Sequence, residues 1–253
     1  MKFIKRLLYF IFSEKTYFRI ISKLFFIMYF SGILRISGKF RMHYFVPHLV
    51  KKGNTIIDIG ANLGYYTRIF AGAAGTEGSV WAVEPVQLYR EVLRRNTSKC
   101  PNVKILPYAL GDKQRVEYMG IPGSQPYRHG LTRIIDNDKD NNKNASVRVE
   151  VKTPGELFAA LGRVDYIKCD IEGYENRVIP GFAEIIKRDR PLIQIELSPA
   201  NRDFINDLLS KEGYISYTTD RKKLRRISTP VDYKDDILYI HKDKHKEIQK
   251  FHK

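Results

Sequence analysis

The segment TIIDIGANLGYYT, residues 55–67, gives the clearest indication of the fold. The apolar, β-branched run 55–59 predicts a buried strand, and helical spacing begins at residue 65. Gly60 and Gly64 lie in the turn between them. A chain that passes from a parallel strand into a helix through glycines exposes backbone N–H groups, and glycine lets a ligand come close to them. The stretch therefore predicts a site for a nucleotide-like molecule.

An acidic residue ends the next predicted strand. Glu84 lies twenty residues beyond Gly64, where a carboxylate can accept hydrogen bonds from both hydroxyls of a ribose. The glycine spacing is G-x-x-x-G, which differs from the G-x-G-x-x-G of dinucleotide sites. No Gly-Lys-Ser/Thr follows, so a phosphate-binding P-loop is excluded as well.

The rest of the central sequence alternates short apolar runs with helical stretches. The predicted strands cover 55–59, 79–84, 103–109, 165–170 and 192–197. The predicted helices cover 65–73, 87–99, 174–187 and 201–212. This alternation is typical of a mostly parallel α/β sheet with right-handed crossovers. Two later runs, 214–219 and 236–241, predict an antiparallel hairpin at the edge of that sheet.

A long polar connection lies between the third and fourth parallel strands. Residues 116–119 and 146–152 predict two extra strands, and 120–144 form the polar loop between them. A loop of this length in a compact domain is either functional or disordered. His129 lies in it and is interpreted as an exposed loop side chain in preference to a second catalytic base.

The charge of +16 belongs to the two ends of the chain. Residues 1–52 contain eleven Lys and Arg against one acid, and residues 221–253 contain eleven against five, whereas 53–220 contain 22 of each. Basic ends can meet nucleic acid or anionic lipid. The two cysteines, Cys100 and Cys169, have no metal-ligand or CxxC spacing, which favours a reducing compartment.

The first forty residues are aromatic, apolar and basic. Their longest uncharged run, 24–34, is too short for a spanning helix, and no signal-peptide cleavage site follows 7–13. One interpretation is a pair of helices lying in a membrane interface with basic groups toward anionic headgroups. The other is that the helices pack on the following domain. We expect a cytoplasmic protein, peripheral on the inner face of the membrane.

Four ordered segments resemble the successive motifs of FkbM-family methyltransferases. They are IIDIGANLGYYT at 56–67, VWAVEP at 80–85, ALGD at 109–112 and DYIKCDIEGYE at 165–175. The resemblance covers about residues 45–200. It implies S-adenosylmethionine (SAM) as the cofactor, and many members of this family methylate hydroxyl groups of sugars and natural products.

The resemblance implies a Rossmann-like class I methyltransferase fold. We expect a seven-stranded, mostly parallel sheet with a C-terminal antiparallel hairpin and added N-terminal helices. The domains would be an N-terminal helical segment at 1–44, a methyltransferase domain at 45–241 and a basic tail at 242–253.

The same resemblance assigns the cofactor residues. The turn around the methionine end of SAM would contain Asp58, Gly60, Asn62 and Gly64. Glu84 would bind the ribose, and Ala109 and Leu110 would lie against the adenine ring.

Acidic residues gather where the fourth and fifth parallel strands end. Alternation puts Lys168 and Asp170 on one face of the fourth strand, and Glu172 follows in the loop. Glu175 is interpreted as an acid in the first turn of a helix, and Glu196 ends the fifth strand. Several carboxylates around one crevice repel each other unless a proton, a lysine or a metal balances them.

Two catalytic hypotheses follow, because a hydroxyl acceptor must lose its proton during methyl transfer. In the first, Asp170 or Glu172 is the base and Lys168 holds a partner in place. In the second, Asp170 and Glu196 bind a hard cation such as Mg²⁺ through oxygen.

The expected function is O-methylation of a sugar, glycan or glycolipid precursor, with an anionic membrane surface as a partner of the N-terminus and no nucleic acid. An RNA methyltransferase with basic ends on phosphates is the first alternative. The acidic rim suits a polyanion poorly. A non-catalytic SAM-binding protein is the second alternative, although no motif residue is missing.

Overall fold

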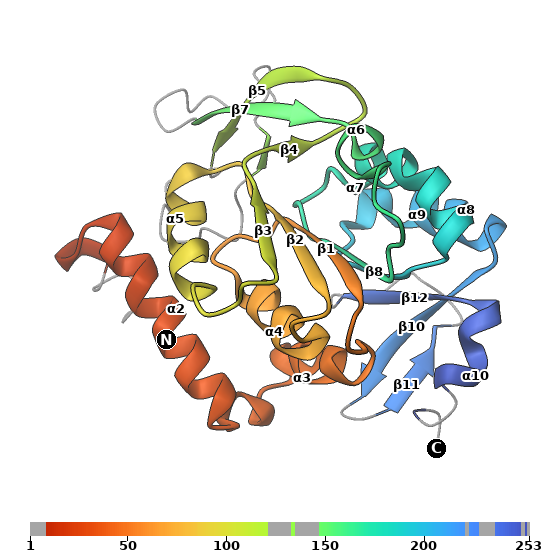
Figure 1. Ribbon diagram of the computed structural model, residues 1–253, viewed down its shortest axis with the longest axis horizontal. Coiled ribbons are helices and arrows are strands. Elements are labelled where there is room, and N and C mark those ends of the chain that lie inside the picture. Colours follow the sequence, from red (N-terminus) through yellow and green to blue (C-terminus); the bar gives the residue numbers. More distant parts are fainter. Residues whose placement is uncertain are drawn as a thin grey trace.

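The computed structural model describes residues 9–120, 133–134, 147–220, 223–227, 236–248 and 251. An eight-stranded sheet forms its centre, with helices on both faces, and a second, four-stranded sheet lies beside it (Figure 1). The strand order of the large sheet is β11-β10-β12-β9-β8-β1-β2-β3. The predicted α/β fold is confirmed, with one more strand than expected.

Five parallel strands make the centre of the large sheet. They are β1 (Thr55–Ile59), β2 (Ser79–Val83), β3 (Val103–Leu106), β8 (Tyr166–Cys169) and β9 (Leu192–Ile195). Every residue of β8 and β9 is buried. Strands that are covered on both faces need such continuous apolar runs, which is why these segments could be located from the sequence.

Three antiparallel strands complete the sheet: β10 (Tyr214–Asp220), β11 (Lys223–Arg226) and β12 (Ile237–His241). The predicted hairpin is confirmed, but β12 inserts between β9 and β10, so the last strand of the chain is internal. β11 was not predicted because it reads KLRR, and only its leucine is buried. A charged edge strand protects a sheet from further pairing.

Helices cover the two faces of the large sheet. On one face, α3 (Arg41–Phe45), the 3₁₀ turn η3 (Val46–His48) and α4 (Tyr65–Ala74) pack against the sheet. The other face carries α6 (Pro154–Phe158), α7 (Glu175–Val178), the 3₁₀ turn η6 (Ile179–Phe182), α8 (Ala183–Asp189) and α9 (Pro199–Lys211). The single helix predicted at 174–187 is wrong in detail. Pro180, which lacks a backbone N–H, divides it into α7, η6 and α8.

The second sheet has the order β4-β7-β5-β6. It contains β4 (Ala109–Leu110), β5 (Arg115–Gly120), β6 (Arg133–Ile134) and β7 (Val147–Lys152). The predicted strand 103–109 is wrong at its end, because β3 stops before Pro107 and the chain then enters this second sheet. The two extra strands are confirmed as β5 and β7. Most of the predicted loop, including His129, lies outside the described residues.

The N-terminal segment packs on the α/β domain. α2 (Glu14–Phe30) lies along α5 (Gln87–Asn96), and Figure 1 shows the two helices side by side. Phe18 and Tyr89 meet edge to face with their ring centroids 5.3 Å apart. The predicted boundary between residues 44 and 45 falls inside α3. In the part of the chain that the structure describes, no helix is long and apolar enough to cross a membrane.

The start of the predicted basic tail also belongs to the body of the domain. After the 3₁₀ turn η8 (Lys242–Lys244), α10 (His245–Ile248) buries Ile248 against the core that contains α3. Phe251 meets Phe45 with ring centroids 5.2 Å apart. Residues 42–50 and the described residues at 248 and 251 therefore share one core with the sheet.

Candidate active site

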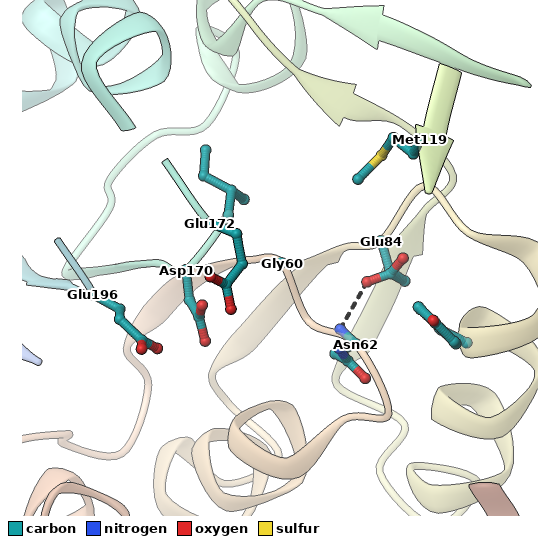
Figure 2. A pocket seen from close by; sticks show the side chains of 9 residues that line it. Gly60, Asn62, Glu84, Met119, Asp170, Glu172 and Glu196 are labelled. Carbon is teal, nitrogen blue, oxygen red and sulfur yellow. Dashed lines mark hydrogen bonds between the residues drawn. The ribbon is translucent and has the colours of Figure 1, made fainter. Parts of the chain in front are cut away.

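Four neighbouring parallel strands end at the same level. Ile59 of β1 pairs with Val83 of β2 and Cys169 of β8, and Cys169 pairs with Ile195 of β9. The residues that follow these four ends are Gly60, Glu84, Asp170 and Glu196. All four line one cavity of about 230 Å³ (Figure 2). The parallel register therefore builds the cavity from segments far apart in the sequence.

The glycine turn after β1 is held in a conformation that requires glycine. Gly60 has φ 74° and Gly64 has φ 84°. A Cβ on Gly60 would lie 1.9 Å from the carbonyl oxygen of Asp170, and one on Gly64 would lie 2.4 Å from Leu93 Cδ1. The backbone of Gly60 thus lies against the residue that follows β8, which joins the glycine turn to the predicted catalytic strand.

Glu84 is fixed by backbone donors. Its Oε2 accepts a hydrogen bond from the N–H of Asn62 at 2.8 Å, and its Oε1 accepts one from the N–H of Val86 at 2.8 Å. The side chain is 4% exposed, and burial raises its pKa to about 7 against the effect of these two bonds. Each carboxylate oxygen can accept a further hydrogen bond, so the geometry fits the predicted contact with two ribose hydroxyls.

The cavity brings together most of the predicted site. Its lining includes Gly60, Asn62, Glu84, Tyr89, Met119, Asp170, Ile171, Glu172 and Glu196. The sequence reasoning missed Tyr89, Met119 and Ile171, the last of which lies between the predicted Asp170 and Glu172. Tyr89 lies in the first turn of α5, the helix that follows Glu84, and that position was a usable signal. Met119 arrives from β5 through pairing within the second sheet, and no local pattern indicates it.

Asp58 and Lys168 lie beneath the cavity and are not part of its lining. Asp58 is fully buried, and its Oδ2 accepts a hydrogen bond from the Thr67 hydroxyl at 2.6 Å. Its Oδ1 has no hydrogen-bond donor among the described residues, and Lys168 Nζ lies 3.9 Å from it. Asp58 therefore connects β1 to α4 through Thr67, and its Oδ1 faces Lys168 Nζ.

Lys168 links the two carboxylates of adjacent strands. It is 2% exposed, and its Nζ donates to Asp170 Oδ2 at 3.1 Å. Burial lowers the pKa of Lys168, but the negative charges of Asp170, Asp58 and Asp236 outweigh that effect and raise it. A charged lysine holding Asp170 is the arrangement that the first catalytic hypothesis requires.

A second acid under the site, Asp236, was not predicted. It precedes β12, and its Oδ2 accepts hydrogen bonds from the Tyr66 hydroxyl at 3.2 Å and from the Gln194 side chain. The Gln194 oxygen accepts in turn from the Tyr166 hydroxyl at 2.8 Å. Lys168 Nζ lies 4.8 Å from the centroid of the Tyr66 ring. Asp236 could have been noticed as the acid that opens the last predicted strand, but its place beside β9 depends on the strand order.

The loop after β8 contains Glu172, which lines the cavity, and leads to Glu175, which holds the loop in place. Glu172 has φ 53°, a strained value for a side chain other than glycine, and it lines the cavity. Glu175 is fully buried and accepts hydrogen bonds from the Gly173 N–H at 2.8 Å and Asn201 Nδ2 at 2.7 Å. These bonds fix the loop, which agrees with the structural interpretation of Glu175.

Glu196 lies at the exposed rim of the cavity, near Asp170 (Figure 2). Partial removal from bulk water raises the pKa of Glu196, and the negative charges of Asp170, Asp236 and Glu172 raise it further, to about 8. The described residues contain no group of three or more His, Cys, Asp or Glu side chains positioned to hold a metal ion. Asp170 and Glu196 alone would supply two of the oxygens that Mg²⁺ needs.

Ala109 and Leu110 are placed differently from the other predicted cofactor residues. Both are buried in β4, at 6% and 4% exposure. Leu110 belongs to the main core under the large sheet, and Ala109 packs with β7. Neither lines the described cavity, so their contact with adenine stays a prediction.

Comparison with known proteins gives a family match and structures of similar fold. The model of the methyltransferase FkbM domain matches residues 58–223, and no protein of curated function matches the sequence. The crystal structure of methyltransferase FkbM from Methylobacillus flagellatus superposes with a TM-score of 0.52 at 20% identity. That match covers 80% of this chain and 48% of the other, so the chain spans about half the length of that relative.

Two further solved structures are more distant. Precorrin-6y C5,15-methyltransferase from Geobacter metallireducens has 12% identity and a TM-score of 0.45, covering 79% of this chain and 84% of that one. A SAM-dependent O-methyltransferase from Thermotoga maritima has 15% identity and a TM-score of 0.41, covering 78% and 63%. Since the domain match covers about two thirds of the chain, including the glycine turn, Glu84 and β8 with Asp170 after it, the chain belongs to the FkbM family of SAM-dependent methyltransferases.

Proposed function

We propose that the protein transfers a methyl group from SAM to a hydroxyl of a sugar, glycan or glycolipid precursor. One observation carries the proposal: a single cavity contains Glu84, held by two backbone N–H groups, and Asp170, held by a buried lysine. The first carboxylate fits a ribose, and the second is available to a hydroxyl. SAM, when bound, supplies an electrophilic methyl group on a sulfonium.

The protein's own part of the reaction is to bind, orient and deprotonate the acceptor. Asp170 Oδ2 is occupied by Lys168, so its Oδ1 is the oxygen that would take the hydroxyl proton. Lys168 donates a hydrogen bond to the carboxylate and fixes its direction. Glu172 remains the alternative base on the same loop. Glu196 becomes a third, because a group with a pKa of about 8 is well matched to proton transfer near neutral pH.

The shape and charge of the rim support a polyhydroxylated acceptor. Asp170, Glu172 and Glu196 present several carboxylate oxygens, and hydroxyl groups can donate to all of them without adding negative charge. A polyanion such as RNA would meet repulsion at the same rim. Sugar hydroxyls are therefore the acceptor class that we propose.

The proposal is tested by incubating the protein with labelled SAM and fractionated lipid-linked sugars, nucleotide sugars and RNA. We expect label in a sugar fraction and none in RNA. Label in RNA, with binding that weakens steeply as salt increases, would replace the proposal. SAM binding by calorimetry without label in any fraction would favour a non-catalytic protein.

The metal hypothesis has a separate test. If Asp170 and Glu196 bind Mg²⁺, EDTA abolishes the transfer and added Mg²⁺ restores it. If the rate is unchanged by EDTA, the base mechanism stands alone. Because SAM binding depends on the opposite side of the cavity, its Kd serves as the control and should not respond to EDTA.

A further inference from the structure

The N-terminal segment has a second apolar face that the core does not use. α2 buries Tyr17, Phe18 and Ile21 against α5. Its opposite side exposes Leu24 (47%), Ile27 (54%) and Phe30 (63%), and the 3₁₀ turn η1 (Ile33–Ile36) continues with Ile33 (52%) and Ile36 (91%). We call these five residues the outer apolar strip.

Exposed apolar side chains are concentrated in the N-terminal segment that contains the outer apolar strip. Among the described residues, twelve large apolar side chains are exposed, and eight of them lie between residues 10 and 36. Leu24, Ile27 and Phe30 recur at the three-residue spacing that keeps side chains on one side of a helix, and η1 packs back on α2. Exposed apolar groups collected in one place mark an interaction site, whereas single ones elsewhere on a surface are ordinary.

Positive charge surrounds the strip. Lys23 lies on the same side of α2, and Arg35, within η1, and Lys39, just after it, are exposed. Residues 15–52 contain eight Lys and Arg and no Asp or Glu. An apolar strip within a basic field is the composition of helices that lie in the interface of an anionic bilayer.

We propose that the outer apolar strip docks the protein on an anionic lipid bilayer. Leu24, Ile27, Phe30 and the two isoleucines would enter the boundary between headgroups and acyl chains. Lys23, Arg35 and Lys39 would then meet lipid phosphates. The inner face of α2 stays packed on α5, so docking requires no unfolding of the domain, and it does not depend on which hydroxyl is methylated.

Charge argues against a second copy of the chain and against RNA as the partner of the strip. In a symmetric dimer, the same basic field would face itself across the contact, and like charges would oppose association. RNA would use the lysines and arginines but would leave the aliphatic side chains without a partner. An anionic bilayer satisfies both parts of the surface.

The test is co-sedimentation of the full chain with vesicles of phosphatidylcholine alone and of phosphatidylcholine mixed with phosphatidylglycerol. We expect binding to the mixed vesicles, weakened by salt, and little binding to the neutral ones. The triple variant Leu24→Ser, Ile27→Ser, Phe30→Ser should lose about a hundredfold in vesicle affinity. Lys23→Glu with Lys39→Glu should abolish the preference for anionic lipid.

Matched controls come from other exposed positions. Phe204, on α9, is 50% exposed, so Phe204→Ser removes an apolar side chain without touching the strip. Lys187→Glu reverses an exposed charge on α8. Both controls should bind vesicles as the unmodified protein does, and every variant should keep its melting temperature and its affinity for SAM.

Three results would overturn the proposal. The first is equal binding to neutral and anionic vesicles, or none. The second is a triple variant that binds as well as the Phe204→Ser control. The third is a protein that elutes as a dimer and becomes monomeric in the triple variant without lipid, which would assign the strip to a second copy of the chain.

Discussion

The two sides of the cavity hold their carboxylates in different ways. On the side of β1 and β2, Glu84 is the acid that lines the cavity, and two backbone N–H groups hold it. On the side of β8 and β9, Asp170, Glu172 and Glu196 line the rim, and one lysine beneath them provides the compensating charge. Figure 2 shows these two groups on opposite sides of Gly60.

Under the proposed function, this difference separates cofactor binding from proton transfer. Backbone donors are fixed by the fold and do not titrate, so the Glu84 side would hold the same cofactor in every cycle. Carboxylates in excess over cations are poised to take a proton, a hydroxyl hydrogen bond or a cation. The cofactor side is thus satisfied within the protein, and the acceptor side is completed by what binds there.

Gly60→Ala is expected to have the largest effect, because Gly60 connects the β1–β2 side of the cavity to the β8–β9 side. The new Cβ would lie 1.9 Å from the Asp170 carbonyl oxygen at a positive φ, so the two strand ends must separate. We expect a loss of about 4 kcal/mol in the free energy of unfolding. SAM binding should be lost by calorimetry.

Gly72→Ala is the matched control, since a Cβ at Gly72 would meet no atom within 4 Å. Gly72 lies within α4, where alanine favours the helix by about 1 kcal/mol. The role assigned to Gly60 would be contradicted if its alanine variant bound SAM as tightly as the Gly72 variant does.

Asp170→Asn should slow methyl transfer without weakening SAM binding. Asparagine keeps the size of the side chain and an acceptor for Lys168, but it cannot take a proton from the acceptor hydroxyl. We expect kcat to fall about a thousandfold while the Kd for SAM changes less than about threefold. Glu184→Gln, at an exposed acid on α8, should change neither constant. Retained kcat would move the role of base to Glu172 or Glu196.

Much of this site could be predicted because its residues follow directly after apolar strands. A run such as 55–59 or 192–197 indicates a buried parallel strand, and the residue at its end must lie at the shared edge of the sheet. Glu84, Asp170 and Glu196 were located in this way, by position alone. Gly60 was marked by the need for close backbone approach.

The residues that were missed depend on pairing between distant segments. Asp236 reaches the site because β12 inserts beside β9, and Met119 because β5 pairs within the second sheet. β3 ends before Pro107 and β4 begins at Ala109, although the apolar pattern of the sequence continues through this region. The exposed side of α2 was ambiguous for a different reason: an apolar helix sequence does not state which of its faces the domain covers.

Glu84→Gln tests the cofactor side by pH. Burial gives Glu84 a pKa of about 7 in the free protein, so the carboxylate becomes ionised as pH rises through 7. Ionised carboxylates are the stronger acceptors for hydroxyl donors, so SAM affinity should increase between about pH 6 and about pH 8. In Glu84→Gln the affinity should be about tenfold weaker at the upper pH and nearly constant across the range.

The matched control for that series is Glu77→Gln, which changes an exposed acid before β2. It should keep both the affinity for SAM and the rise with pH. If the Glu84 variant retained the same rise, another group would be responsible for the proton that is lost on binding.

The smallest expected effect is on the acceptor side, where Glu196→Gln should change stability in a pH-dependent way. The folded-state pKa of Glu196, about 8, lies above its ordinary value of 4.5, so the folded state binds a proton that the unfolded state has released. The stabilisation from that proton is complete below about pH 4.5 and is lost as pH rises through about 8.

Glutamine is neutral throughout, so the melting temperature of Glu196→Gln should exceed that of the unmodified protein by a growing margin as pH increases. Because Glu196 is exposed at the rim, solvent screens it, and the margin at about pH 9 should be only a few degrees. A margin that is the same at every pH would show that the acids of the acceptor side do not repel one another. Added Mg²⁺ distinguishes the remaining hypothesis, since a cation held by Asp170 and Glu196 should stabilise the unmodified protein and not the variant.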